Sequence, residues 1–299
     1  MTVVLEVETV YIKGPFDVKA LENEPCVMAL GFFDGVHLGH RKLIETSRGI
    51  AERKNLTLAV MTFFPHPSNV LPTNQKINKY LSPLDAKKEI FKDLGVEKLF
   101  IVTFNHEFAK LAPADFVQEY ICGLNCTHVV AGFDFTYGYK GQGNMDRIKD
   151  DGDGEFDITV VSKESYKNIK ISSTKIRELL NGGAVELVPH FLGNFYSTCG
   201  QIEDESYDLK NQKTMVKVTF KDYMLPRKGT YLVRLKTEQN MIEGICTLSE
   251  NTPDVHTIRV HSNDRLHLKP TVKVEWISEL ETLPKGEGAG TEEKDQMVV

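Results

Sequence analysis

The densest group of residues that could do chemistry lies in the segment GFFDGVHLGHR, residues 31–41. A short apolar run ends there and a long amphipathic run begins, which predicts a strand, a Gly-containing turn and a helix that starts near His40. Glycines let the backbone approach a ligand closely, and free N–H groups at a helix start attract phosphate. His37 and His40 are three residues apart, so both imidazoles can donate hydrogen bonds to one polyphosphate. We therefore predict a phosphate site here, in preference to a helix cap or a surface histidine.

A second candidate site is ISSTKIR, residues 171–177, directly before a short amphipathic run. Hydroxyl residues at such a position normally cap a helix, and that role is compatible with function. The same hydroxyls, together with exposed N–H groups and an arginine, also form an anion pocket. The candidate anion-binding residues are Ser172, Ser173, Thr174 and Arg177.

Two aromatic loops follow other apolar runs: FPHP at residues 64–67 and GFDFTYG at residues 132–138. Both come after the carboxyl ends of expected parallel strands, which places them at the same sheet edge as the histidines. Their aromatic rings could stack on a planar ligand, and Asp134 could bind a sugar or a ring edge. Ordinary turn packing is the alternative for each loop.

The elements that must position these motifs follow from the periodicity of residues 1–184. Short apolar runs alternate with amphipathic runs, a pattern typical of a parallel sheet with helices on both faces. This predicts a doubly wound, Rossmann-like α/β domain. Its strands are expected at 27–31, 57–63, 98–102, 128–131 and 157–161. Its helices are expected at 40–54, 83–94, 113–121 and 174–181, the last ending at Gly182 and Gly183.

The pattern changes after residue 184. One more apolar turn, 185–192, leads into β-rich runs separated by Gly, Pro, Asn and Asp, which predict a small antiparallel β-barrel or sandwich domain over 185–278. Residues 279–299 hold six acids against two lysines, and we expect an acidic disordered tail. The β-rich runs are 214–220, 230–235, 242–248, 255–261 and 271–277.

Composition limits the class of protein. A chain of 299 residues suits two domains, and a net charge of −6 gives no overall positive field for nucleic acid or an anionic membrane, so any phosphate site must be local. No apolar run is long enough to cross a bilayer, and the first residues lack a basic leader, so we expect a cytoplasmic protein. Five scattered cysteines indicate a reducing compartment, and Cys122 and Cys126 lack a second pair at metal-ligand spacing, which favours structural thiols over zinc.

The motifs together resemble those of a known family. GFFDGVHLGHR, FPHP, FNHEFAKLAPADF, GFDFTYGYKGQG and ISSTKIR occur in the order and approximate spacing of the bacterial bifunctional riboflavin kinase/FAD synthetases, over residues 20–195. The resemblance implies a nucleotidyltransferase of the His-x-Gly-His superfamily. Such an enzyme transfers AMP from ATP to FMN, gives FAD and pyrophosphate, and uses Mg²⁺. Its substrates are small molecules, and its oligomeric state is not implied.

The resemblance also assigns roles to residues. It implies that His37 and His40 act on the ATP phosphates and that Arg177 acts with them in catalysis. The expected nucleotide-pocket residues are Gly31, Phe32, Asp34 and Gly35. The leaving pyrophosphate is expected at Ser172, Ser173, Thr174 and Arg177. FMN or adenosine is expected at Pro65, His66, Pro67, Asp134 and Phe135. Tyr137 stands where the family usually has phenylalanine, and no metal ligand is assigned.

The second half departs from the family. Its framework residues Leu192, Gly193, Tyr196 and Gly200 match, as does LPxxGxY at 225–231. The flap glycines and the Pro-Thr-Ala-Asn segment of the family's kinase barrel are missing, and Asp254 replaces the expected catalytic glutamate. Phosphoryl transfer depends on positioning and on charge neutralisation, so we expect a barrel without kinase activity.

The expected chemistry is an in-line attack by an FMN phosphate oxygen on the α-phosphorus of ATP. Bound polyphosphate would raise the pKa of both histidines, so we expect them to act partly charged. Three alternatives stay open at this point. One is a bifunctional riboflavin kinase/FAD synthetase. Another is an enzyme of the same superfamily with a different acceptor, such as nicotinamide mononucleotide, phosphopantetheine or glycerol phosphate. The last is a non-catalytic flavin-binding sensor.

Overall fold

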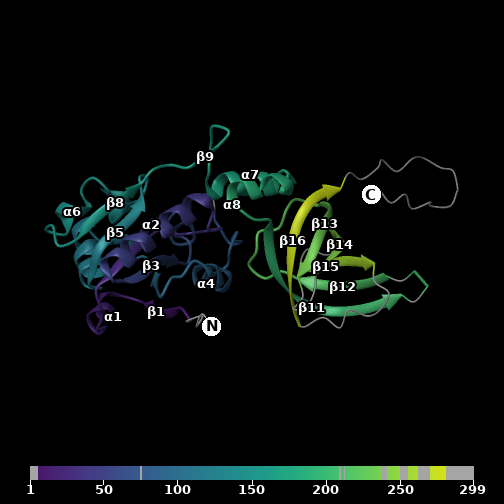
Figure 1. The fold of residues 1–299 in the computed structure, drawn as a ribbon, viewed down its shortest axis with the longest axis horizontal. Helices are drawn as coiled ribbons and strands as arrows, with labels where there is room; N and C mark the ends of the chain where they lie inside the picture. Colours follow the sequence, from purple (N-terminus) through teal and green to yellow (C-terminus); the bar gives the residue numbers. More distant parts are fainter. Residues whose placement is uncertain are drawn as a thin grey trace.

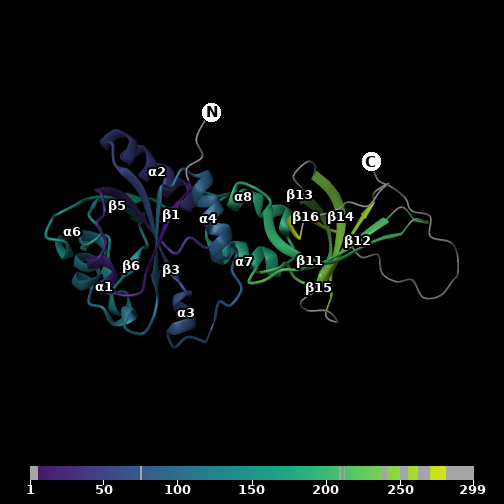
Figure 2. The same cartoon turned by 90° about the horizontal axis from the view of Figure 1, so that it is seen from below.

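A parallel sheet covered by helices is followed along the chain by a closed β-barrel (Figure 1). The computed structural model describes residues 6–74, 76–208, 210–211, 213–236, 241–249, 255–261 and 270–280. Helices α7 (Ser173–Asn181) and α8 (Pro189–Leu192) lie between the sheet and the barrel, as a second view also shows (Figure 2). The predicted combination of a doubly wound domain and an antiparallel barrel is confirmed.

The sheet has six strands in the order β1-β4-β3-β2-β5-β8, and every neighbouring pair is parallel. β2 pairs with both β3 and β5, so the strand order reverses there, and this is where open α/β sheets bind ligands. The five predicted strands are present, but β1 was not predicted because its residues are mostly half-exposed and show no buried run. The bounds are β1 Glu8–Ile12, β2 Cys26–Leu30, β3 Thr57–Phe64, β4 Lys98–Thr103, β5 Cys126–Gly132 and β8 Asp157–Val161.

Helices cover both faces of this sheet. α2 (Leu38–Lys54) and α4 (Leu84–Asp93) pack on one face, where the strands contribute residues such as Val27 and Ala29. The other face, which includes Met28, packs against α5 (Pro113–Phe116) and the π-helical turn that continues it. The shorter elements are α1 Pro15–Lys19, α3 Pro67–Val70, the 3₁₀ turns Phe108–Lys110, Tyr139–Gly141 and Val185–Leu187, the π turn Val117–Cys122, α6 Ile148–Asp151, and hairpin strands β6 Thr136–Tyr137, β7 Gly143–Asn144, β9 Ser165–Tyr166 and β10 Ile169–Lys170.

The barrel closes in the order β11-β12-β15-β14-β13-β16, and all its pairs are antiparallel. Its long first strand was missed, because from Gln201 onward the residues are mainly polar and largely exposed. β16 continues to Leu280, so the predicted start of the tail at Glu279 is two residues too early. The bounds are β11 Tyr196–Asp208, β12 Lys213–Thr219, β13 Gly229–Lys236, β14 Met241–Leu248, β15 Val255–His261 and β16 Thr271–Leu280.

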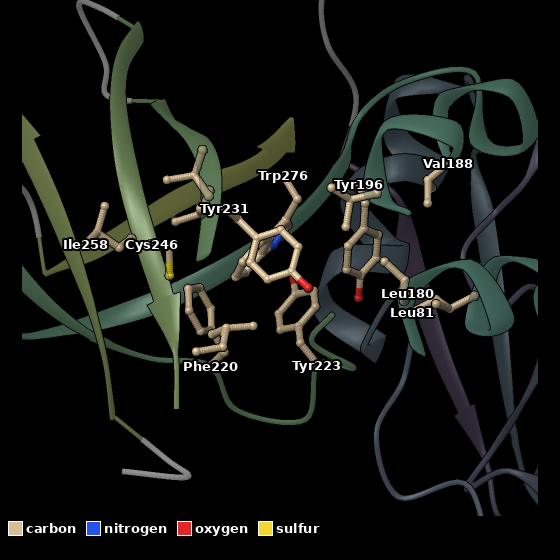
Figure 3. Close-up of a cluster of buried hydrophobic side chains, with 14 of the residues drawn as sticks. Leu81, Leu180, Val188, Tyr196, Phe220, Tyr223, Tyr231, Cys246, Ile258 and Trp276 are labelled. Atoms are coloured by element: carbon tan, nitrogen blue, oxygen red, sulfur yellow. The ribbon is translucent and has the colours of Figure 1, made fainter. Parts of the chain in front are cut away.

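One hydrophobic cluster joins the barrel to the helices beside it (Figure 3). Trp276, Tyr231 and Tyr196 are fully buried in it, and the ring of Tyr231 meets that of Trp276 edge to face at 5.5 Å. α7 and α8 contribute Leu180 and Leu192 to the same cluster. The domain boundary expected after residue 184 therefore falls within a shared core, and its position stays a prediction.

The remaining sequence expectations have mixed outcomes. Asp254 and residues 281–299 lie outside the described residues, and the expectations for them stay predictions. Cys126 is buried and Cys122 is half-buried, and burial raises the pKa of the Cys122 thiol to about 12. In the described part of the chain, no helix has the length and apolar character needed to span a membrane.

Candidate active site

The segment 31–37 leads from β2 into α2, at the edge of the sheet where the strand order reverses. α2 begins at Leu38, two residues before the predicted start. His37 is its N-cap, and the His37 Nδ1 accepts a hydrogen bond from the backbone N–H of His40 at 3.2 Å. The two imidazole rings stack with their centres 3.6 Å apart. The fold thus brings the predicted histidine pair together at the helix start.

Both histidines are neutral in the ligand-free protein. Burial lowers the pKa of His37 from 6.5 to about 4, and it lowers the pKa of His40 well below its usual range, with His37 and Lys87 adding to the effect. Desolvation dominates in the ligand-free state, and the expectation that bound polyphosphate makes the rings partly charged stays a prediction. Since Nδ1 of the neutral His37 ring accepts a hydrogen bond, its proton lies on Nε2.

The His40 ring has an unsatisfied polar atom. Its Nδ1 is buried and has no hydrogen-bond partner among the described residues, while the Phe33 ring lies edge-on at 5.1 Å. Such atoms also occur elsewhere in the described chain, for example at Glu119 and Thr214, so this atom by itself does not indicate a ligand. The stacked rings at the start of α2 are what mark the candidate phosphate site.

Glycines make the close packing of this turn possible. Gly35 has φ +83°, and a Cβ there would lie 3.0 Å from Leu81 Cδ1. A Cβ on Gly39 would lie 3.3 Å from two atoms of the His37 ring. A side chain at residue 39 would therefore require the His37 ring to shift by a few tenths of an ångström from its place over the first turn of α2. Gly31 is close to Phe33 in the same way.

Asp34 and Arg177 form a buried ion pair. Arg177 Nη2 donates to Asp34 Oδ2 at 2.6 Å, and the backbone N–H groups of Leu81 and Ser82 donate to Oδ1 at 2.9 and 3.2 Å. Ser173 Oγ donates to the carbonyl of Asp34 at 2.8 Å. The Asp34 carboxylate is therefore engaged within the protein, and it positions Arg177 rather than offering itself to a nucleotide.

Of the two residues that flank Ser173, Ser172 has a structural role and Thr174 is exposed to solvent. Ser172 is the N-cap of α7, with its Oγ accepting from the N–H of Lys175 at 3.2 Å. Thr174 is exposed at the first turn. The predicted cap at the start of this helix is confirmed, and α7 ends as predicted at Gly182.

The FPHP loop lies against the β2 turn. The His66 ring meets the Phe32 ring at 4.4 Å, and burial lowers the pKa of His66 from 6.5 to about 4. His66 Nδ1 accepts from the N–H of Ser68, which makes His66 the cap of α3, with Pro67 in the first turn and the peptide before Pro65 in the cis form. Tyr80 Oη accepts from the N–H of His66 at 3.3 Å. Phe32, His66 and Tyr80 thus form one aromatic group beside Asp34 and Arg177.

The loop after β5 also reaches this edge. Lys170 Nζ donates to Asp134 Oδ2 at 2.5 Å, and both groups act on the pKa of His37, which places the pair near the histidines. Phe133 is half exposed and lies under Lys170 at 5.2 Å. Phe135 instead packs against the buried residues beneath the sheet. The assignment of Phe135 to a ligand stays a prediction, and Phe133 is the exposed ring of this loop.

Comparison with known proteins shows the family of the chain. The family model for FAD synthetase matches residues 19–175. A bifunctional riboflavin kinase/FMN adenylyltransferase of Bacillus subtilis is 39% identical over 94% of this chain and 92% of its own length. The chain belongs to the FAD synthetase family. The chain is therefore an FMN adenylyltransferase, a nucleotidyltransferase of FAD biosynthesis.

Two further proteins are similar to this chain over most of its length. An FAD synthetase of Listeria monocytogenes is 27% identical over 83% of this chain and 93% of its own length. The structure of a macrolide-efflux protein from Streptococcus pneumoniae superposes with a TM-score of 0.83, covering 94% of this chain and 93% of that one. At 24% sequence identity that likeness shows the two-part fold and nothing of function.

Three residues of the candidate site were not predicted from the sequence: Lys87, Lys170 and Tyr80. Lys87 is 1% exposed, its Nζ donates to the Phe32 carbonyl at 3.0 Å, and burial lowers its pKa from 10.5 to about 8. Nothing in the helix LDAKKEIFKD distinguishes it from the neighbouring surface lysines. Lys170 could have been found, because it directly precedes ISSTKIR.

The departure at Tyr137 has a structural explanation. Tyr137 is buried, and its hydroxyl donates to Asp151 Oδ2 at 2.6 Å. Arg147 in turn donates to Asp151 Oδ1 at 2.6 Å. The extra hydroxyl of this FAD synthetase is thus satisfied within the protein beneath the sheet, away from the histidine pair.

Proposed function

We propose that this FAD synthetase transfers AMP from ATP to FMN at the β2–α2 turn and that its barrel has no riboflavin kinase activity. The observation that carries the first part is the stacked pair His37 and His40 at the start of α2, at the sheet edge where the strand order reverses. A non-catalytic flavin sensor would have no use for such a pair.

The proposed mechanism needs no enzyme nucleophile. An FMN phosphate oxygen attacks the α-phosphorus of ATP, the new P–O bond forms, and the bond to the bridging oxygen breaks to release pyrophosphate. His37 and His40 donate to the phosphates, and Arg177 with Ser172 and Thr174 meets the negative charge that accumulates on the leaving pyrophosphate. The Ser173 hydroxyl, which was also predicted here, donates to the Asp34 carbonyl, so its proton is already engaged within the protein. Fixed donors of this kind act without reorganisation during the reaction.

Cations beside the histidines would add to this effect. Lys87 contacts the Phe32 carbonyl and lowers the pKa of both His40 and His66, so its charge lies close to all three residues. Lys170 and Asp134 lie on the His37 side. We infer that Lys87 holds the Gly31–Phe32 turn in place through its hydrogen bond to the Phe32 carbonyl. We also infer that Lys170, an exposed residue, contacts the phosphates from the solvent side.

We also propose that Mg²⁺ takes part, carried by the nucleotide. Mg²⁺ usually keeps several waters and binds through one or two carboxylates plus substrate phosphates. The described residues contain no group of three or more His, Cys, Asp or Glu that could hold a metal alone, so the phosphates would provide most of its ligands, with Asp134 as the nearby carboxylate. When bound, the ion would screen phosphate charge.

The absence of kinase activity is inferred from the barrel sequence. The family's Pro-Thr-Ala-Asn segment supplies Mg²⁺ and ATP ligands, and no such segment occurs here. Relatives whose names include riboflavin kinase favour the bifunctional alternative, so the two activities must be tested separately.

The decisive experiment incubates purified full-length protein with ATP and Mg²⁺, with FMN or riboflavin as the acceptor, and separates products by chromatography. The expected result is FAD from FMN and no product from riboflavin. FMN or FAD formed from riboflavin would show a working kinase and refute the second part. No product from either acceptor would refute the first part and favour a flavin-binding sensor. A panel of nicotinamide mononucleotide, phosphopantetheine and glycerol phosphate tests the choice of acceptor.

A further inference from the structure

A short segment of the barrel pairs with the first part of the chain beside the active site. The backbone N–H of Tyr80 donates to the Asp222 carbonyl at 2.7 Å, and the N–H of Met224 donates to the Tyr80 carbonyl at 2.8 Å. Tyr80 and Tyr223 thereby form an isolated parallel bridge. Both tyrosine side chains are buried. We call residues 222–224 the barrel clamp.

The backbone that the clamp holds is the one that holds Asp34. Leu81 and Ser82 directly follow Tyr80, and their N–H groups donate to Asp34 Oδ1. The other carboxylate oxygen of Asp34 accepts from Arg177. The backbone pairing at Tyr80 is therefore connected to the guanidinium of Arg177. The connection consists of the two hydrogen bonds from Leu81 and Ser82 to Asp34 and the ion pair between Asp34 and Arg177.

A direct contact runs from the clamp to the same guanidinium. Arg177 Nη1 donates to Met224 Sδ at 3.3 Å. The hydroxyl of Tyr196, a fully buried residue of β11, donates to the Met224 carbonyl at 2.6 Å. Figure 3 shows Tyr196 on the side of the barrel core that faces Leu81 and Leu180. Met224 is thus fixed through its N–H and its C=O while its sulfur contacts Arg177.

A second anchor secures the far end of the arginine's helix. The N–H of Arg227 donates to the Leu180 carbonyl in the last turn of α7 at 2.9 Å, and Arg227 pairs with Glu279 of β16 at 2.8 Å. A Cβ on Gly183 would lie 2.5 Å from atoms of both side chains, so the glycine lets this ion pair lie against the helix end. The barrel therefore holds α7 at its end and Arg177 at its side chain.

We propose that the barrel clamp is part of the adenylyltransferase machinery, with Met224 as a positioning residue that orients Arg177 toward the leaving pyrophosphate. The proposal rests on the role proposed above for Arg177. A guanidinium has five N–H donors in a rigid fork, and Asp34 and Met224 each engage one terminal nitrogen, which sets its plane and leaves other donors for substrate. A barrel without kinase activity would then still be needed for catalysis.

The test uses full-length Met224→Ala, Met224→Leu and Arg177→Ala, with Met215→Ala as the matched control. Met215 is an exposed methionine of β12 in the same barrel. Forward kinetics and the reverse reaction, in which FAD and pyrophosphate give ATP and FMN, are measured alongside thermal unfolding. Met224→Ala should lower forward kcat by about three- to tenfold, the usual effect of losing one modest hydrogen bond.

The reverse reaction separates positioning from a merely structural role. Met224→Ala should raise the KM for pyrophosphate and leave the KM for FAD unchanged, while Met224→Leu, which keeps the packing volume, restores most of the loss. In an Arg177→Ala background, Met224→Ala should have no further effect on kcat, because residues that act through one another are not additive. Met215→Ala should match the wild type.

Two results would overturn the proposal while leaving the proposed function intact. One is a Met224→Ala variant that behaves like Met215→Ala when Arg177→Ala is strongly impaired. The other is full additivity of the two substitutions. A fully active Arg177→Ala variant would refute the catalytic role proposed for Arg177, and the proposal for the barrel clamp, which depends on that role, would be refuted as well.

Discussion

Replacement of Lys87 by methionine should stabilise the protein at neutral pH while it lowers activity. Lys87 is buried, and its Nζ donates to the Phe32 carbonyl, which also accepts from Thr62 Oγ1 at 2.9 Å. Methionine is of similar length and carries no charge. Because Thr62 still satisfies the carbonyl, Lys87→Met leaves no buried acceptor unpaired, and replacing a desolvated charge by an apolar group is often stabilising.

The magnitude follows from the pKa. Burial lowers the pKa of Lys87 from 10.5 to about 8, against a smaller opposing effect of Asp34. Each tenfold change in proton affinity is about 1.4 kcal/mol, so keeping this ammonium charged in the fold costs about 3 kcal/mol. The unfolded chain binds the proton more tightly, so the contribution of Lys87 to the free energy of unfolding rises between pH 8 and pH 10.5. The advantage of Lys87→Met should therefore be largest below pH 8 and shrink across that window.

Urea unfolding of the wild type and Lys87→Met from pH 7 to pH 10.5 measures this difference, and Lys88→Met is the control. Lys88 is the next residue of α4, pairs with Asp85 at 3.4 Å, and has its pKa raised by the hydroxyl of Tyr11. Its replacement should give no stabilisation at pH 7. The kcat for FAD formation should fall about tenfold in Lys87→Met, as expected when a fixed cation beside a phosphate site is lost. A Lys87→Met variant that is less stable than the wild type at pH 7, by a margin that does not change with pH, would refute the desolvation argument.

Three further predictions concern neighbouring residues. Gly39→Ala should lower kcat about tenfold with little change in Tm, because its methyl group would lie 3.3 Å from the His37 ring and displace that ring. Steady-state kinetics and a melting curve test this, and an unchanged kcat would contradict it. His37→Asn keeps a good N-cap but should lower kcat about a hundredfold. The pKa of His37 is about 4 in the folded protein and 6.5 in the unfolded chain, so the free energy of unfolding of the wild type should fall as the pH falls from 6.5 to 4. Urea unfolding at pH 7 and pH 4.5 should show a smaller fall for His37→Asn. Equal falls in the two proteins would argue against a buried neutral ring. Tyr137→Phe should cost about 1 kcal/mol of stability through the lost hydrogen bond to Asp151 and leave FAD formation unchanged; a clear loss of activity would place Tyr137 in the site.

The convergence of the motifs could be predicted from the sequence because it follows from the geometry of a parallel sheet. Segments 31–37, 64–67 and 132–138 each follow a strand, and the carboxyl ends of parallel strands meet at one edge. Short apolar runs predicted the four inner strands, β2, β3, β4 and β5, because strands buried on both faces read as continuous apolar segments. β8, at the edge of the sheet, was predicted from a similar apolar run although it is largely exposed or half-exposed. β1 and β11 lack such runs, and they were missed.

The partners of individual side chains could not be predicted. Asp34 and Arg177 are 143 residues apart, and only the folded chain brings their charges to 2.6 Å. Lys87 has the sequence context of a surface lysine, and its burial depends on Phe32 and Thr62 from other elements. The direction of the histidine pKa shifts depends in the same way on burial, which no local pattern encodes.

The charges of the site are nearly balanced before any substrate binds. Arg177 is held by Asp34, Lys170 by Asp134 and Lys87 by a backbone carbonyl, while both histidines are neutral. The net charge of the site therefore does little to favour ATP over other anions. It also does little to stabilise the transition state more than bound ATP. The rate advantage must come from donors that are oriented toward charge that appears only as pyrophosphate leaves. Orientation is what the barrel clamp would provide for Arg177, and this gives a physical reason for a FAD synthetase without kinase activity to keep its barrel.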